Sequence, residues 1–434
     1  MTERRDFIKT AGAALTTQIF TGAVKGANDR VSAAFIGMGR MGTSNLEVAM
    51  RQPNVEVVAV CDVYQPHLEK AIAATGRGPN REPGARTPAR GVTDFREILH
   101  DKSIDVVCIA TPDHWHAYMT VEACKNGKDV YVEKPICVVV EEGRKMVQAA
   151  RKYNRVVQAG TMQRSGKHFQ QACEIVRSGQ LGRVTFVRTW NYSNENGIGN
   201  PPDGAPVPGL DWEMWLGPAP EHAFNANRFG VDPKKFSHFR WFWDYAGGMM
   251  TDWGIHLLDI VQMAFDEATP TAITALGEKF FIQDNTDTPD TLQVTYEYPG
   301  FITTYENRLG NANSMFKQGY GILFHGTKGT MFVDRSRYEV FPEKNSDLQA
   351  VEVKSSNNSN MAHWANFLDC VKTRQRPISD IEIGHRSTTT ALLGNVALRS
   401  KMRIDWDAKT ETTAQPAARK YLHREYRKPW KLEV

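Results

Sequence analysis

The chain is short of cysteine and has no long apolar run. Its six cysteines among 434 residues form no CxxC pair and show no spacing typical of zinc ligands. No neighbouring residue in the sequence would lower a thiol pKa, so we interpret all six as structural thiols. No segment reaches the roughly 18 consecutive apolar residues of a membrane-spanning helix. This predicts a mature chain without an integral membrane segment.

An excess of charge of one sign is missing as well. The sequence has 53 Lys and Arg against 49 Asp and Glu, a formal net charge of +4. Its basic clusters, residues 77–90 and 421–431, are short and interleaved with Pro, Gly or aromatic residues. We therefore expect no nucleic-acid partner. The composition is that of an ordinary globular protein, and the length exceeds what one core serves, which predicts two domains.

Residues 1–29 resemble a twin-arginine export signal. Two adjacent arginines, Arg4 and Arg5, precede a Phe-Ile-Lys triplet and a weakly apolar stretch over residues 10–24. The resemblance implies an exported, periplasmic protein. The alternative is a basic tail with a chance Arg-Arg pair, in which case the protein is cytoplasmic. Residues 21–28 contain no clean Ala-x-Ala site, so cleavage of the leader stays an open question.

The first domain, residues 30–158, alternates short β-branched runs with helical stretches. The expected strands are residues 31–36, 55–60, 105–110, 129–132 and 156–159. The expected helices are residues 43–50, 66–74, 94–100, 119–126 and 141–153. Strands that alternate with helices of this length form βαβ units. The pattern predicts an α/β fold whose N-terminal domain is a doubly wound parallel sheet.

The remainder, residues 159–434, is richer in Trp, Tyr, Thr and Asn. Alternating runs over residues 183–191, 292–298 and 329–333 predict antiparallel strands of a second domain. Residues 344–360 are polar, and we expect them to form a surface loop.

A glycine motif, Gly37-x-Gly39-x-x-Gly42, lies between the first expected strand and the following helix. In a dinucleotide-binding turn the first glycine permits the tight turn, the second lets the backbone approach the pyrophosphate, and the third allows close helix packing. The backbone amides near Arg40 and Met41 would then receive the phosphates at the helix N-terminus. The alternative is a plain βαβ turn that binds no nucleotide.

Asp62 ends the second expected strand, 20 residues after Gly42. An acidic residue at this distance typically holds the ribose hydroxyls of the adenosine and repels a 2′-phosphate. This favours NAD over NADP, although the guanidinium of Arg40 would tolerate the phosphate.

A polar motif, Thr-Pro-Asp-His-Trp-His over residues 111–116, directly follows the expected strand at residues 105–110. Ligands of a doubly wound sheet collect at the carboxyl ends of strands, so this loop should border the cofactor. The candidate contacts are Thr111, Asp113, Trp115 and His116. The His-x-His pair lacks a third ligand, so we expect no metal.

Two more motifs supply acid–base groups. Glu133-Lys134-Pro135 follows the next strand, where both charged residues should border the cofactor and the Lys134 ammonium could bind a substrate hydroxyl. Asp252 and His256 are four residues apart, on one side of an expected helix. A histidine is the natural acceptor for an alcohol proton, and Asp252 could orient it or the substrate. The alternatives are a surface charge pair and a satisfied core histidine.

The three motifs together resemble the Gfo/Idh/MocA oxidoreductases, named for glucose–fructose oxidoreductase and inositol dehydrogenase. Residues 212–218, 240–259, 326–333 and 363–386 look like the bacterial C-terminal subtype of this family. The resemblance implies a Rossmann domain packed on a C-terminal α/β domain. The large, mainly antiparallel open sheet of that domain often mediates assembly, which implies a homo-oligomer. It also implies that Lys134 and His256 are the catalytic pair, assisted by Asp252.

The resemblance implies hydride transfer between nicotinamide and a secondary alcohol of a sugar, glycoside or polyol. Lys134 would polarise the hydroxyl, His256 would take its proton, and Glu133 would help to hold Lys134. Gln163, Arg164 and His168, after the last Rossmann strand, are candidates for the substrate pocket. Aromatic residues between 236 and 245 could stack on a sugar face, although such clusters are more often core.

Export would require the NAD to be tightly bound and to be regenerated within the site. This is compatible with a dehydrogenase that couples two sugars, or with redox-neutral glycoside cleavage through a transient keto-sugar. The glycoside-cleaving branch of the family usually lacks the lysine of Glu-Lys-Pro, so Lys134 favours a dehydrogenase. A sensor that kept the fold and lost the chemistry is disfavoured because Lys134, Asp252 and His256 are all present.

Overall fold

The computed structural model describes residues 30–77, 84, 86–230, 237–313 and 315–434. The predicted leader, residues 1–29, lies outside the described residues, as does Phe236 of the aromatic cluster. Within the described ranges, no helix combines the length and apolar character needed to cross a bilayer. All six cysteines are buried, and none forms a disulfide.

The N-terminal half is a parallel sheet, as predicted, and its order is β3-β2-β1-β4-β5-β6. It has six strands, one more than the five expected, because the short strand β3 was missed. Its strands are β1 (Val31–Ile36), β2 (Val55–Cys61), β3 (Arg90–Val92), β4 (Val106–Ile109), β5 (Asp129–Val132) and β6 (Val157–Ala159). Its helices are α2 (Arg40–Ala49), α3 (Gln65–Thr75), α4 (Phe95–His100), α5 (Asp113–Lys125) and α6 (Val140–Lys152). The strand order reverses at β1, which pairs with both β2 and β4, so a ligand crevice is expected outside their carboxyl ends.

The C-terminal half is built on a ten-stranded sheet in the order β14-β13-β12-β11-β7-β10-β9-β8-β15-β16. The strands are β7 (Val184–Tyr192), β8 (Ala272–Glu278), β9 (Thr291–Tyr298), β10 (Phe301–Arg308), β11 (Tyr320–Gly326), β12 (Gly329–Val333), β13 (Arg337–Pro342), β14 (Val351–Lys354), β15 (Ile404–Asp407) and β16 (Thr412–Thr413). The sheet is mainly antiparallel, as expected, and β7 with β10 is its parallel pair. The stretch expected as a polar loop contains β14, because its Val-Glu-Val-Lys run pairs with β13 at the sheet edge.

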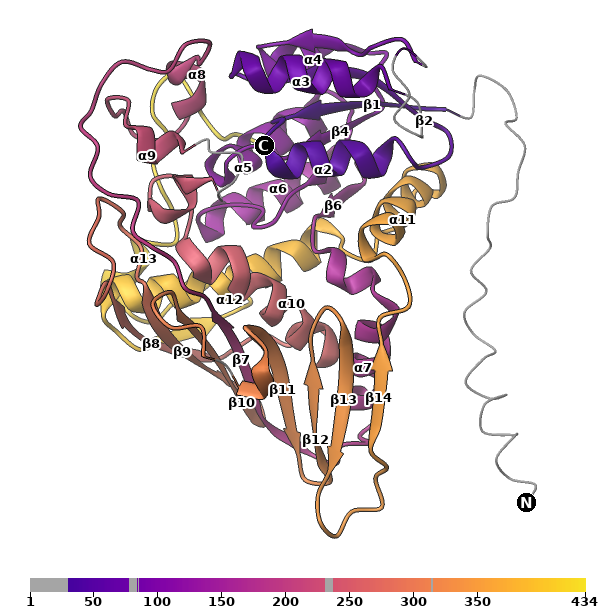
Figure 1. The fold of residues 1–434 in the computed structure, drawn as a ribbon, viewed down its shortest axis with the longest axis vertical. Helices are drawn as coiled ribbons and strands as arrows, with labels where there is room; N and C mark the ends of the chain where they lie inside the picture. Colours follow the sequence, from indigo (N-terminus) through magenta and orange to yellow (C-terminus); the bar gives the residue numbers. More distant parts are fainter. Residues whose placement is uncertain (1–29, 78–83, 85, 231–236, 314) are drawn as a thin grey trace.

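Helices join the two halves (Figure 1). The α helices of the C-terminal half are α7 (Lys167–Arg177), α8 (Trp212–Leu216), α9 (Ala226–Phe229), α10 (Ile255–Ala264), α11 (Ser359–Thr373), α12 (Ile381–Ser400) and α13 (Pro416–Arg419). Short 3-10 turns are η2 (Met162–Ser165), η3 (His238–Trp241) and η5 (Met315–Lys317), and η4 (Met250–Gly254) is a π-helical turn. Figure 1 shows α12 running between the sheets, where it packs on α6 of the first half and on β8 of the second. The main hydrophobic core is therefore continuous through both halves.

Candidate active site

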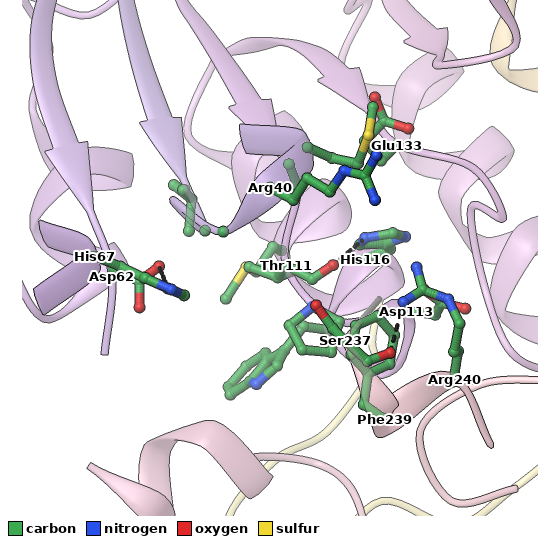
Figure 2. A pocket seen from close by; sticks show the side chains of 18 of the residues that line it. Arg40, Asp62, His67, Thr111, Asp113, His116, Glu133, Ser237, Phe239 and Arg240 are labelled. Carbon is green, nitrogen blue, oxygen red and sulfur yellow. Dashed lines mark hydrogen bonds and ion pairs between the residues drawn. The ribbon is translucent and has the colours of Figure 1, made fainter. Parts of the chain in front are cut away.

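A cavity of about 310 Å³ lies at the carboxyl ends of β1, β4 and β5. One wall comes from the Rossmann half, including the glycine motif, Asp62 and Lys134. The other wall comes from the C-terminal half, including Arg240, His256 and Arg335. In Figure 2, Asp62 and His67 lie together at one end of this cavity, and Arg240 lies beside Asp113 at the other.

The glycine motif has the geometry of a dinucleotide turn. Gly37 has φ +86°, in the left-handed region that favours glycine. A Cβ on Gly42 would lie 1.8 Å from the Gly37 carbonyl oxygen, so the helix approaches the turn too closely for any side chain. A Cβ on Gly39 would meet only the ring of His67, at 3.9 Å, which leaves open space in front of the N-terminus of α2. No side chain caps that N-terminus, and a helix N-terminus attracts phosphate.

Asp62 is tied to this turn by its carboxylate. Its Oδ2 accepts a hydrogen bond from the Met38 N–H at 2.6 Å, and its Oδ1 accepts one from the Tyr64 N–H at 2.8 Å. The His67 ring lies 3.5 Å from Oδ2. The carboxylate is therefore held at the end of the cavity beside the glycine motif, where an adenosine ribose fits.

The Thr-Pro-Asp-His-Trp-His segment differs from the expected loop. Helix α5 begins at Asp113, six residues earlier than predicted, and Pro112 is its N-cap residue. The indole of Trp115 donates to the Trp215 carbonyl at 3.0 Å. The ring nitrogens of His116 contact the Pro135 and Thr111 carbonyls, so these two residues brace the cavity wall. Burial lowers the pKa of His116 to about 4, which keeps its ring neutral.

Thr111 and Asp113 leave polar groups at the cavity. Thr111 Oγ1 is buried and has no hydrogen-bond partner within the described chain. Burial raises the pKa of Asp113 to about 8, against the opposing charges of Arg240 and Lys134. Asp113 is therefore mostly protonated at neutral pH, as a carboxyl group that can donate as well as accept.

Lys134 is held by Asp252 across the cavity. The Lys134 Nζ donates to the Asp252 Oδ1 at 3.0 Å and to its backbone carbonyl at 2.9 Å. Burial favours the neutral form of Asp252, but Arg240 and Lys134 outweigh it and hold the pKa of this carboxyl well below its usual range. The ion pair places a fixed ammonium on the side of the cavity that His256 lines.

Glu133 does not hold the Lys134 ammonium, contrary to the expectation. Its carboxylate accepts a hydrogen bond from the Asn45 amide at 2.8 Å and a long one, 3.3 Å, from the Lys134 backbone N–H. It therefore ties the end of β5 to α2. Burial raises the pKa of Glu133.

His256 follows the π-helical turn that carries Asp252. The wider turn keeps the two residues on neighbouring faces as η4 passes into α10. The ring is buried, and its Nδ1 has no partner within the described chain. Burial, then the charges of Lys134 and Arg335, hold the pKa of His256 well below its usual value. The imidazole is therefore neutral, and a neutral imidazole can accept the proton of a substrate hydroxyl through one ring nitrogen.

The substrate candidates that follow β6 do not line the cavity: Gln163 and Arg164 lie in η2 behind its wall, and the His168 ring contacts the Asp334 carbonyl at 3.0 Å. Arg164 is 2% exposed and pairs with Asp259 at 2.8 Å and Glu267 at 2.5 Å. These carboxylates occupy its guanidinium, so its role is structural and the substrate assignment is corrected. The Gln163 amide donates to the His256 carbonyl at 3.0 Å and accepts from Arg335 Nε at 2.9 Å, which makes Gln163 a support of the site.

The aromatic cluster divides between the core and the cavity. Phe242 and Tyr245 are buried with Trp212 and Trp215 in a separate hydrophobic cluster. Phe239 lines the cavity. The structure therefore gives Phe242 and Tyr245 the core role.

The cavity residues that sequence reasoning missed include Arg240, Trp253 and Arg335. Arg240 bridges to Asp252 Oδ1 at 3.4 Å, and Arg335 stacks 4.7 Å above the ring of Trp253. Trp253 lies inside the Asp-x-x-x-His motif, which was a usable signal. Nothing in the sequence distinguishes Arg335 from its neighbour Arg337.

The site fits a nicotinamide dinucleotide. One cavity contains the features that a dinucleotide needs. They are the open space at Gly39, the uncapped N-terminus of α2, the carboxylate of Asp62 and the unpartnered Thr111 hydroxyl. Among the described residues, no three His, Cys, Asp or Glu side chains gather as a metal site.

Comparison with known proteins gives the same class. Residues 31–161 match the oxidoreductase-family NAD-binding Rossmann fold of Gfo/Idh/MocA, and residues 174–432 match the family's C-terminal alpha/beta domain. These matches cover well over half of the chain. The protein belongs to the Gfo/Idh/MocA oxidoreductase family, whose N-terminal domain binds NAD.

Two curated relatives each match a little over a third of the chain. A glycosyl hydrolase family 109 protein of Shewanella sp. (strain W3-18-1) is 30% identical over 156 residues, 36% of this chain and 34% of the relative. An inositol 2-dehydrogenase of Salmonella agona (strain SL483) is 30% identical over 165 residues, 38% of this chain and 46% of the relative. The match thus spans less than half the length of either relative.

A solved structure extends the likeness of fold over most of the chain. A levoglucosan dehydrogenase in complex with NADH aligns with a TM-score of 0.66 at 16% identity. The alignment covers 87% of this chain and 99% of that one.

Proposed function

We propose that the protein oxidises a secondary alcohol of a sugar, glycoside or polyol with NAD as hydride acceptor. The observation that carries this proposal is the Lys134–Asp252 ion pair beside the neutral, unsatisfied His256, in the cavity that contains the dinucleotide turn. Lys134, His256 and Asp252 are the proposed catalytic residues. The relatives named inositol 2-dehydrogenase and levoglucosan dehydrogenase support the class of substrate.

The proposed roles follow from the charges of these groups. The Lys134 ammonium donates a hydrogen bond to the substrate hydroxyl and lowers the energy of the developing alkoxide. The neutral His256 imidazole accepts the hydroxyl proton as general base. Asp252 holds the Lys134 ammonium in place through their hydrogen bond. When bound, NAD supplies the acceptor for the hydride that leaves the alcohol carbon.

The first test is an absorbance scan of the freshly purified protein with no cofactor added. A band at about 340 nm that appears with one sugar and disappears with a keto-sugar supports a resident nicotinamide and reversible hydride transfer. Sugar oxidation that requires external NAD supports the dehydrogenase and contradicts tight binding. Absence of turnover under both conditions contradicts the proposal.

The second candidate is redox-neutral glycoside cleavage through a transient keto-sugar. The relatives that carry the glycosyl hydrolase family 109 name favour it. The same scan separates the two, because this reaction releases free sugar from a glycoside without net accumulation of NADH. Retention of Lys134 favours the dehydrogenase.

We predict an unusually acid lower limit for the pH profile. Oxidation needs neutral His256, whose pKa is lowered by burial and by the Lys134 and Arg335 charges. Because a lowered pKa keeps the neutral form present at lower pH, kcat/KM should stay level as pH falls through 6.5, the ordinary histidine value, and decline only below it. A steady-state pH series tests this. A half-point at or above 6.5 contradicts neutral His256 as the base.

We also propose export through the twin-arginine route, on the sequence of residues 1–29 alone. Replacing both Arg4 and Arg5 by Lys should retain the protein in the cytoplasm, as measured by cell fractionation. If the variant is distributed between periplasm and cytoplasm in the same way as the unmodified protein, residues 1–29 do not act as a twin-arginine signal. A tightly bound NAD is the corollary, since the protein would cross the membrane folded.

A homo-oligomer is a further part of the proposal. Leu276, Phe280, Phe281 and Ile302 are large apolar side chains exposed on or beside the ten-stranded sheet, and Leu276 is 80% exposed. Light scattering of the full chain tests this, and a monomeric mass at all concentrations contradicts it.

A further inference from the structure

Arg335 projects into the substrate side of the cavity from the turn between β12 and β13. Its guanidinium lies 4.7 Å above the Trp253 ring and 5.8 Å from the Tyr320 ring. Its Nε donates to Gln163 Oε1 at 2.9 Å. Two aromatic faces and one hydrogen bond thus fix the plane of the guanidinium.

The guanidinium of Arg335 makes no ion pair with the described residues. Within the described chain, no carboxylate lies within 4.0 Å of its guanidinium, and its two Nη groups have no protein partner. By contrast, the buried guanidinium of Arg164 has two carboxylate partners, and that of Arg424 bonds Glu142 at 2.6 Å. A half-buried cation without a counter-ion is costly, so a ligand that supplies one would be stabilised.

The surrounding cavity carries an excess of positive charge. Lys134, Arg240 and Arg335 line this side, and Asp252 is the carboxylate held ionised among them. Asp113 is mostly protonated at neutral pH, because burial raises its pKa to about 8. Lys134 and Arg240 both pair with Asp252, whereas no carboxylate of the described chain lies within ion-pair distance of Arg335.

We propose that the substrate is a sugar acid, whose carboxylate is bound by the two Nη groups of Arg335. This rests on the proposed dehydrogenase function and names its substrate class. The two Nη donors match the two oxygens of a carboxylate, and the single charge of a carboxylate equals that of the guanidinium. Arg335 is thus a specificity residue: it anchors the acid so that a hydroxyl of the same sugar reaches Lys134 and His256.

The experiment compares methyl hexosides with the corresponding methyl hexuronosides on the purified holoenzyme. We expect kcat/KM to be at least about 30-fold higher for the acid of the preferred pair, the range of a charge-assisted hydrogen bond. In Arg335→Gln this ratio should collapse toward one, and in Arg335→Lys it should be partly restored. The matched control is Arg337→Gln, two residues away, whose guanidinium already pairs with Glu339 at 3.4 Å and should keep the ratio.

A binding measurement keeps this test independent of turnover. Calorimetric titration of the holo Lys134→Met variant should show tighter binding of the hexuronoside than of the hexoside, and a second replacement, Arg335→Gln, should remove the difference. Three results would overturn the carboxylate assignment. The enzyme could oxidise neutral sugars as well as the acids, or it could prefer a sugar phosphate to both. Arg335→Gln could also lower kcat/KM equally for hexoside and hexuronoside. If no sugar reduces NAD, the proposed function fails, whereas oxidation without an acid preference overturns only this inference.

Discussion

Replacing Lys134 by Met is expected to lower kcat by about a thousandfold while NAD stays bound. Methionine keeps much of the apolar stem but removes the ammonium, which is 3.0 Å from Asp252 and is the proposed donor to the reacting hydroxyl. Loss of one charged donor to a developing oxyanion typically costs about 100- to 1,000-fold, and general acid–base groups contribute about 100- to 10,000-fold. Single-turnover formation of NADH and the cofactor content of the purified variant are the two measurements.

The control for this variant is Lys145→Met. Lys145 lies on the outer face of α6, where it pairs with Glu141 at 2.7 Å, and its replacement should leave kcat unchanged. A Lys134→Met variant with near-normal kcat would contradict the assigned role of Lys134. A variant that also loses NAD would show that Lys134 acts mainly on the cofactor.

The variants Gly42→Ala and Gly39→Ala should differ in their effect on stability. At Gly42 the Cβ would lie 1.8 Å from a backbone oxygen, and backbone can make room only if α2 moves away from the β1 turn. We expect the free energy of unfolding to fall by about 2–3 kcal/mol, as for overpacking, with loss of NAD binding. At Gly39 the nearest atom is 3.9 Å away and φ is −67°, so stability should be unchanged.

The Gly39→Ala methyl would instead occupy the space where the pyrophosphate approaches the backbone. We expect NAD affinity to fall about 100-fold, which corresponds to about 2.7 kcal/mol. Denaturant melts give the stability of each variant, and calorimetric titration of protein stripped of nucleotide gives its affinity. Equal destabilisation by the two alanines would contradict the close approach of α2 to the turn at Gly42, and normal affinity in Gly39→Ala would place the pyrophosphate elsewhere.

Much of the dinucleotide end could be predicted from short spacings in the chain. Gly37, Gly39 and Gly42 lie within one turn, so their distances depend on local backbone geometry. Asp62 follows a strand that pairs directly with β1, and parallel pairing brings its carboxylate to the turn. Asp252 and His256 are similarly local, although the π-helical form of the turn between them has no signal in the sequence.

Contacts between distant segments could not be predicted in the same way. Lys134 and Asp252 meet across 118 residues, because the packing of the two halves around α12 sets their distance. The same packing places Arg164 between two carboxylates and brings Gln163 within hydrogen-bond distance of Arg335. Gln163 and Arg164 are adjacent polar residues, and the sequence does not distinguish their roles. In the folded chain Arg164 forms a buried ion pair, whereas Gln163 supports the site.

Arg335 and Arg337 show the same limit at the substrate end. Both arginines border one turn, and their sequence context offers equal grounds for either role. The tertiary structure turns Arg337 toward Glu339 and Arg335 toward Trp253 and the cavity. Local periodicity therefore defined the elements and the cofactor turn, because those depend on neighbours along the chain. Charge balance within the cavity arose from long-range packing, because it depends on which side chains face one another after folding.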